Sequence, residues 1–163
     1  MKRTRFQFTL DQVSTDPVSA TLSGLFKGYA ATPEHHTRIY INSYANLIDD
    51  ANWGGPDQYA FGTRFPQSFL LSGTNVITLE QVNDAGITLD ALFVNWFELN
   101  YARNYTAAND EMYFLEQAGD WEFQLNGFTA DSVQIFDITA PAQPARITGA
   151  IIQSQGPTYQ ARF

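Results

Sequence analysis

The sequence predicts an all-β fold, arranged as a sandwich. Short runs rich in β-branched and aromatic residues alternate with polar residues, as strands of about four to eight residues do. Gly, Pro, Asn and Asp separate these runs, and they are the residues that turns favour. Aromatic residues make up 15% of the chain, and no segment combines a helical period with helix caps. Together these observations favour a layered β structure, and a jelly roll is the topology that we prefer.

The elements follow in chain order. We expect strands over residues 6–10, 19–29, 36–42, 58–65, 76–81, 91–105, 111–115, 121–125 and 133–138. Residues 43–56 are expected to form a long loop or a short hairpin at one end of the sandwich, and Asn126-Gly127 a tight turn. The tail, residues 147–163, adds one or two strands or begins a following strand pair. We expect a single sandwich domain over residues 1–163, with no repeat and no linker.

The segment 91–105 is the most distinctive strand. Its apolar side chains occupy both alternating faces, which predicts a strand inside the layered structure and not at its rim. Trp96 and Trp121, on predicted strands, are assigned to the core.

Charge excludes two classes of partner. The 17 acidic residues outnumber the 9 basic ones, which gives a net charge of −8. A nucleic-acid binder needs a basic face, and an anionic membrane surface also attracts basic segments. We therefore expect neither as a partner. No apolar run is long enough to span a membrane.

The chain contains no cysteine. This rules out disulfides, thiolate zinc sites and a cysteine nucleophile within these residues. The basic N-terminus alternates at once like a strand and lacks the apolar centre of a signal peptide. We therefore expect residues 1–163 to be a fragment of a larger protein.

Polar residues in the predicted loop offer a candidate metal site. Asp49, Asp50, Asn52 and Asp57 supply the hard oxygen ligands that calcium prefers. Their spacing is not that of an EF-hand, and we favour a solvated loop with Asx turns. A structural calcium held by acidic groups distant in the sequence stays open as an alternative.

Aromatic residues flank the same loop and offer a candidate carbohydrate site. Tyr44, Trp53 and Tyr59 would stack on the apolar faces of sugar rings, while Asp49, Asp50 and Asn52 bonded the hydroxyl groups. The alternative, which we favour, is that Trp53 folds back and caps the core.

Evidence for catalysis is weak. His35 and His36 are adjacent on a strand and point to opposite faces, so they cannot act as facing ligands, and we assign them structural or surface roles. Glu98 with Glu111 or Glu122 would give the carboxylate pair of a glycosidase, but the sequence supplies no distance between them. A carbohydrate-active enzyme remains the third hypothesis.

Several motifs resemble known families. Residues 34–42 (EHHTRIYIN) and 70–79 (LLSGTNVITL) resemble strand patterns of galactose-binding-like jelly rolls. LFVNWFELNYARNY, followed by EMYF, NGF and VQIFDITAPAQP, resembles the β-rich region that precedes the catalytic domain of gingipain-like secreted cysteine peptidases. The resemblance covers residues 34–147, and the order of the motifs is more specific than any one of them.

The resemblance implies a function. The peptidase chemistry of that family needs a cysteine in a separate domain, so its catalytic role does not carry over to this chain. It implies instead a non-catalytic accessory or interaction domain of a secreted or cell-surface bacterial protein, whose partners are the neighbouring domains. A carbohydrate-binding module is the alternative.

Overall fold

The computed structural model describes residues 2–29, 34–82 and 91–163, and it confirms the all-β prediction. The chain divides into two compact units, Met1–Arg103 and Asn104–Phe163. Each unit has its own apolar core. The single sandwich that we expected over residues 1–163 is therefore confined to the first unit, because the apolar residues after Arg103 pack among themselves.

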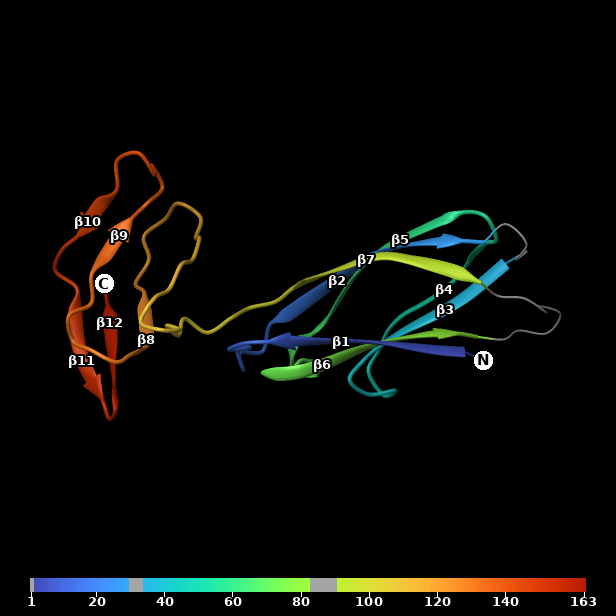
Figure 1. Cartoon of the computed structure of the whole chain (residues 1–163), viewed down its shortest axis with the longest axis horizontal. Helices are drawn as coiled ribbons and strands as arrows, with labels where there is room; N and C mark the ends of the chain where they lie inside the picture. Colours follow the sequence, from blue (N-terminus) through green and yellow to red (C-terminus); the bar gives the residue numbers. More distant parts are fainter. Residues whose placement is uncertain (1, 30–33, 83–90) are drawn as a thin grey trace. The chain divides into compact units, whose positions relative to one another are not determined.

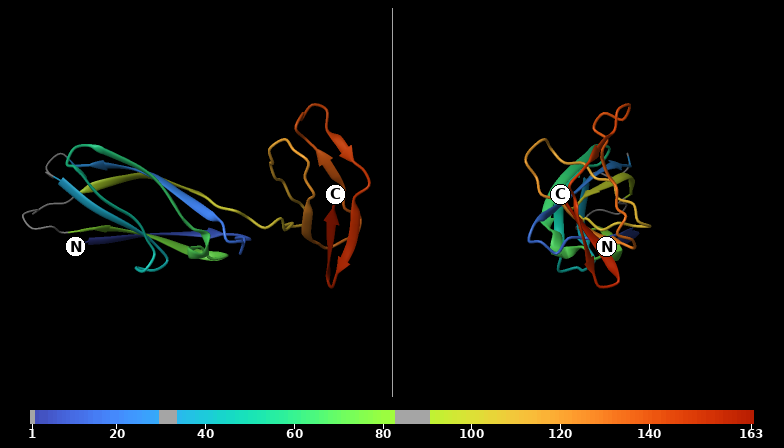
Figure 2. Two further views of the ribbon diagram at one scale, coloured as in Figure 1. Left: turned by 180° about the vertical axis from the view of Figure 1, so that it is seen from behind. Right: turned by 90° about the vertical axis from the view of Figure 1, so that its left-hand side faces the viewer.

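The N-terminal unit is a sandwich of two antiparallel sheets (Figures 1 and 2). The first sheet has the order β1-β6-β3-β4 and the second the order β5-β2-β7. The strands of the first sheet are β1 (Lys2–Leu10), β6 (Gly73–Gln81), β3 (Glu34–Ile41) and β4 (Leu47–Gly54). Those of the second are β5 (Gln58–Pro66), β2 (Ser19–Gly28) and β7 (Leu92–Asn100). A short 3-10 helix, η1 (Gln67–Phe69), follows β5.

Alternation along the strands places the core between these sheets. On β2, every second residue from Ala20 to Gly28 is buried, and on β3 the buried positions include Thr37, Ile39 and Ile41. The core therefore holds mostly residues that the period-two pattern predicts.

The strand β7 corrects the prediction made for residues 91–105. It lies at the edge of its sheet and pairs, among the described strands, with β2 alone. Its outward side chains are exposed, with Phe93 at 62% and Trp96 at 43%. The apolar residues on both faces thus mark one core face and one exposed aromatic face, so the assignment of Trp96 to the core is wrong.

The C-terminal unit contains two small sheets. One has the order β11-β12-β8 and the other pairs β10 with β9. Their strands are β8 (Gln124–Phe128), β9 (Ile135–Asp137), β10 (Ala145–Ile147), β11 (Ile151–Gln155) and β12 (Thr158–Arg162). The tail was expected to add one or two strands, and it adds two, the pair β11 and β12.

Three details of the C-terminal unit differ from the sequence prediction. The segment 112–123 contains no regular strand, so the predicted strand over 111–115 is wrong and that over 121–125 is displaced to β8. Asn126-Gly127 lies inside β8 and not in a turn, because Gly127 has a φ of +84° where the pairing with β12 shifts register. Trp121 is 57% exposed and not in the core.

Candidate functional site

The residues predicted to bind a ligand lie on two strands and one turn of the N-terminal unit. Residues 43–56 were expected to form a long loop or a short hairpin, and the structure has the hairpin, in which β4 takes up most of the segment. Asp49 and Trp53 face the sandwich interior from β4, whereas Asp50 and Asn52 face outward. Strand alternation therefore divides the predicted site between two faces of one sheet.

The inward set forms an aromatic stack. The Trp53 ring lies 4.1 Å from the His35 ring and 5.7 Å from the Tyr59 ring, measured between centroids. The indole Nε1 of Trp53 donates a hydrogen bond to Thr37 Oγ1 at 3.1 Å, and the residue is 9% exposed. A ring that is buried in this way cannot stack on a sugar. The carbohydrate site centred on Trp53 is therefore wrong, and the alternative that it caps the core is correct.

Asp49 belongs to the same interior cluster. Its carboxylate accepts hydrogen bonds from the Tyr59 hydroxyl at 3.0 Å and from Thr63 Oγ1 at 3.4 Å. Burial raises the pKa of Asp49, although these hydrogen bonds oppose the rise. Burial and the neighbouring carboxylate also raise the pKa of Tyr59. The cluster thus joins β4 to β5 by polar bonds inside the sandwich.

Of the two outward residues, Asp50 belongs to a row of alternating charges, whereas Asn52 is the register partner of His36. Arg3, Glu80, Arg38 and Asp50 are register neighbours across β1, β6, β3 and β4. Arg3 Nε donates to Glu80 at 2.8 Å, and Arg38 Nε donates to Asp50 at 2.9 Å. Opposite charges on directly paired residues of neighbouring strands stabilise the sheet.

Further polar contacts complete this row. His36 Nε2 lies 2.7 Å from an Asp50 oxygen, and the Tyr40 hydroxyl donates to Glu80 at 2.7 Å. Burial alone would raise the pKa of Asp50, but the hydrogen bonds from His36 and Arg38 outweigh it and lower that pKa. Tyr44 is exposed, and its ring carries the Arg3 guanidinium 4.2 Å from its centre.

These contacts also bear on metal and catalytic chemistry. In the described ranges, no three side chains of His, Cys, Asp or Glu gather as metal ligands. The residues of the candidate carboxylate pairs lie in different units, with Glu98 in the first and Glu111 and Glu122 in the second. Glu122 accepts a hydrogen bond from Arg162. Because the chain has no cysteine, it is not itself a cysteine peptidase.

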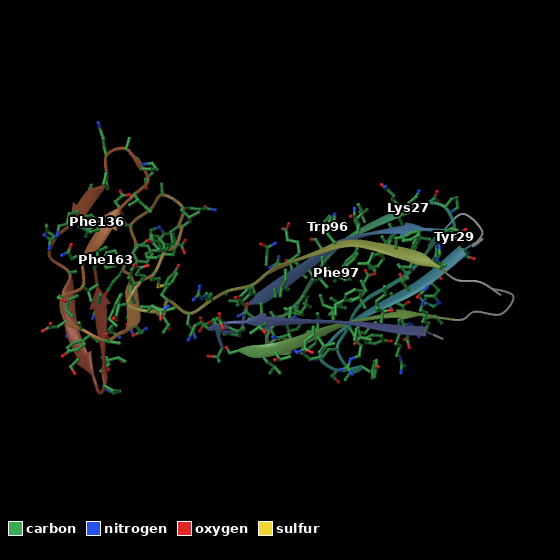
Figure 3. The ribbon with its side chains drawn as sticks, in the orientation of Figure 1. Lys27, Tyr29, Trp96, Phe97, Phe136 and Phe163 are labelled. Atoms are coloured by element: carbon green, nitrogen blue, oxygen red, sulfur yellow. The ribbon has the colours of Figure 1, made fainter. Side chains whose placement is uncertain are left out.

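An exposed aromatic surface lies on the outer face of β5-β2-β7, where the sequence analysis placed no site. It consists of Tyr29, Phe93 and Trp96, and the Tyr29 and Phe93 rings are 6.5 Å apart. The register shift between Leu25 and Phe26 brings Phe93 and Trp96, three residues apart, to the same face. Figure 3 shows Trp96 and Phe97 projecting from opposite sides of β7. A bulge has no clear signal in the sequence. Strict alternation therefore places Phe93 and Trp96 on opposite faces of the strand, although the structure has them on one face.

A second apolar surface lies within the C-terminal unit. It is a hollow of about 1270 Å³ bounded by the irregular segment 110–119 and by residues that include Trp121, Phe136 and Phe163. Phe136 lies on β9 and Phe163 follows β12 (Figure 3). Leu115 is 96% exposed beside this hollow. The core cluster of the unit contains three buried apolar residues, Leu125, Phe128 and Ala161, so much of its apolar surface remains uncovered.

Comparisons with known proteins give a structural likeness but no sequence match. No family model and no curated protein sequence matches the chain. Among solved structures, the crystal structure of dimeric latent PorU from Porphyromonas gingivalis matches with a TM-score of 0.63 and 10% identity. The match covers 98% of this chain and 16% of the PorU chain. The likeness shows a shared fold, and residues 1–163 span a small part of the matched protein. In the described ranges, no helix has the length and apolar character needed to cross a membrane.

Proposed function

We propose that residues 1–163 form a non-catalytic accessory domain of a larger, secreted bacterial protein of the gingipain-like type. Its role is to pack against neighbouring domains of that protein. The observation that carries the proposal is the apolar hollow of the C-terminal unit, with Leu115, Tyr113 and Trp121 exposed at it. Contiguous exposed apolar surface of this kind marks an interaction site.

The structural likeness supports this proposal. Nearly the whole chain, both units included, matches a small part of the PorU chain. A fold that occurs within a much longer chain has neighbouring domains available to cover its apolar surface. The galactose-binding-like relationship and the secreted or cell-surface location belong to the same proposal, on the basis of the sequence resemblance. A structural calcium, held by acidic groups distant in the sequence, belongs to it as well.

Hydrogen exchange tests the proposal. The chain is expressed alone and as part of the full-length gene product, and amide exchange is compared over residues 112–123. We expect fast exchange in the isolated chain and protection in the full-length protein, because a neighbouring domain covers the hollow. The paired strands β8 and β12 serve as the control and should exchange slowly in both. Equal exchange over 112–123 in the two samples would refute the packing role.

The exposed aromatic surface favours carbohydrate binding as a second candidate function. Tyr29, Phe93 and Trp96 present rings to solvent, and Glu98 and Asn100 offer hydrogen-bonding groups along the same strand. A glycan-array screen, with and without calcium, tests it directly. Binding that is lost in Trp96→Ala but kept in Tyr44→Ala would support this site, and a blank array from folded protein would remove it.

A further inference from the structure

The side of the sandwich at β1 and β7 is open. Among the described strands, β1 is the edge of one sheet and β7 the edge of the other. The Phe6 and Phe97 rings lie 5.2 Å apart, so the two edges face each other across the interior. At one end this side is closed, because Ser14 N donates to Ala102 O at 3.0 Å and Val13 bridges Arg103. The remaining length exposes the apolar interior.

An apolar groove of about 320 Å³ occupies this opening. Its walls are Phe6 and Phe8 of β1 and Phe97 and Leu99 of β7, and Leu22 and Ile77 also line it. Phe6, Phe8, Phe97 and Leu99 are only partly buried. By contrast, Ile39 and Ile41 on the interior face of the same sheet are 0% exposed. Burial of the core is therefore incomplete on the β1 and β7 side.

The strand order explains what the groove lacks. In an eight-stranded jelly roll, the first strand pairs with the last strand and lies over the second strand, at the edge of the other sheet. When β1 to β7 are counted as the second to eighth strands of such a fold, the orders β1-β6-β3-β4 and β7-β2-β5 match its two sheets, and only the first strand is missing from the described strands. A sheet of four strands thus faces a sheet of three. None of the described strands takes the place beside β7 and over β1.

We propose that this groove receives a β-strand from the parent polypeptide, outside residues 1–163. The strand pairs antiparallel with the free edge of β7 and inserts alternate apolar side chains against Phe6 and Phe8. Since β1 and β7 end near the Val13–Arg103 bridge, a strand antiparallel to β7 ends where β1 begins. A short connection to Lys2 would then suffice.

The inference rests on the proposed function, because it needs a longer parent polypeptide. The likeness to PorU supplies the matching observation: the fold occupies 16% of that chain, which leaves ample sequence outside it. The inferred strand also gives a physical reason for two exposed edges in one sandwich. Unpaired edges invite aggregation, and native proteins usually cover them.

A fused strand tests the groove directly. A designed segment of alternating Val and Thr, matching the nine residues of β1, is placed before Lys2. A linker of about four residues spans the roughly 10 Å between packed sheets. We expect the Tm of the full chain to rise by at least about 4 °C. The amides of the fused strand should become protected from exchange.

Two controls make the result specific. The same fusion with its two central Val residues changed to Asp should leave the Tm unchanged, because charges cannot enter the apolar groove. In the fused protein, Leu99→Lys should abolish the gain, whereas Asn100→Lys, on the exposed face of the same strand, should keep it. If Leu99→Lys fails to fold, the Val and Asp fusions alone decide the question.

The outcomes are distinguishable from those of the packing test. Free exchange of the fused strand with an unchanged Tm would overturn the strand-acceptor groove and leave the packing role of the C-terminal unit intact. An equal Tm gain from the Asp fusion would also overturn it. Failure of the packing role would show only in the exchange of residues 112–123.

Discussion

The two lateral sides of the N-terminal sandwich are closed in different ways. At the β4 and β5 side, Trp53 stacks on Tyr59, and Asp49 accepts hydrogen bonds from Tyr59 and Thr63. At the β1 and β7 side, an apolar groove reaches the core. The β4 and β5 side, whose Asp and Trp residues suggested a binding site in the sequence, is therefore structural. The β1 and β7 side, which remains accessible, is lined by apolar residues of the core.

Removal of the closing tryptophan should have the largest effect on stability. Trp53→Ala deletes a buried ring and its hydrogen bond to Thr37, which should lower the free energy of unfolding by about 3–5 kcal/mol. Urea unfolding followed by circular dichroism measures the change. Tyr44→Ala, on an exposed ring whose contact with Arg3 is lost, is the control and should change stability by no more than about 1 kcal/mol. Equal losses in both variants would contradict the structural role of Trp53.

The closed side also contains a close backbone approach. A Cβ atom at Gly28 would lie 1.7 Å from the Gly55 carbonyl oxygen and 2.5 Å from His35 Nε2. Gly28→Ala must therefore displace backbone, and we expect a loss of about 1–3 kcal/mol in thermal or urea unfolding. Gly62→Ala is the matched control, since its Cβ would meet Ser23 Oγ at 3.4 Å, an ordinary contact. A neutral Gly28→Ala would show that this end is loosely packed.

The fold was largely predictable from the sequence, but the site was not. Alternation identifies most strands because one face of each is buried, as on β2 and β3. Within 43–56 it left a loop and a hairpin as alternatives, because the polar residues Asp49, Asp50 and Asn52 conceal the alternation of β4. Two of these three bind partners on neighbouring strands, 12 residues away for Asp50 and 10 for Asp49, and the alternation of the sequence does not reveal such pairings.

Two further features, the bulge in β7 and the division into two units, could not be predicted from the sequence. The bulge that aligns Phe93 with Trp96 depends on how β7 pairs with β2, and the division after Arg103 depends on which apolar residues pack together. Neither follows from composition or from the period of the sequence. The open groove follows from sheet order, which becomes visible only in three dimensions.

Two adjacent aspartates give opposite pH dependences. The pKa of Asp49 is raised by burial, so the folded protein takes up this proton before the unfolded chain does, and the site stabilises the fold as pH falls. The pKa of Asp50 is lowered by its partners, so its contribution is lost as pH falls. Urea unfolding of Asp49→Asn and Asp50→Asn at pH 7 and at about pH 3 separates them.

We expect wild type to gain stability relative to Asp49→Asn between pH 7 and about pH 3, and to lose it relative to Asp50→Asn. Both effects should be smaller than that of Gly28→Ala, since each involves one partly exposed carboxylate. The same sign for both variants would contradict the placement of the two residues on opposite faces of β4.

The smallest effect on stability is expected at the exposed aromatic surface. Trp96→Ala removes a ring that is 43% exposed on the outer face of β7, so unfolding should change by less than about 0.5 kcal/mol. The adjacent Phe97→Ala should cost more, about 2 kcal/mol, because the partly buried Phe97 ring packs against Phe6 and Phe26 inside the sandwich. Urea unfolding of the two variants compares neighbouring residues on one strand. A large loss in Trp96→Ala would mean that its ring is needed for folding and is not available to a ligand, which would remove the carbohydrate-binding candidate on grounds of stability alone.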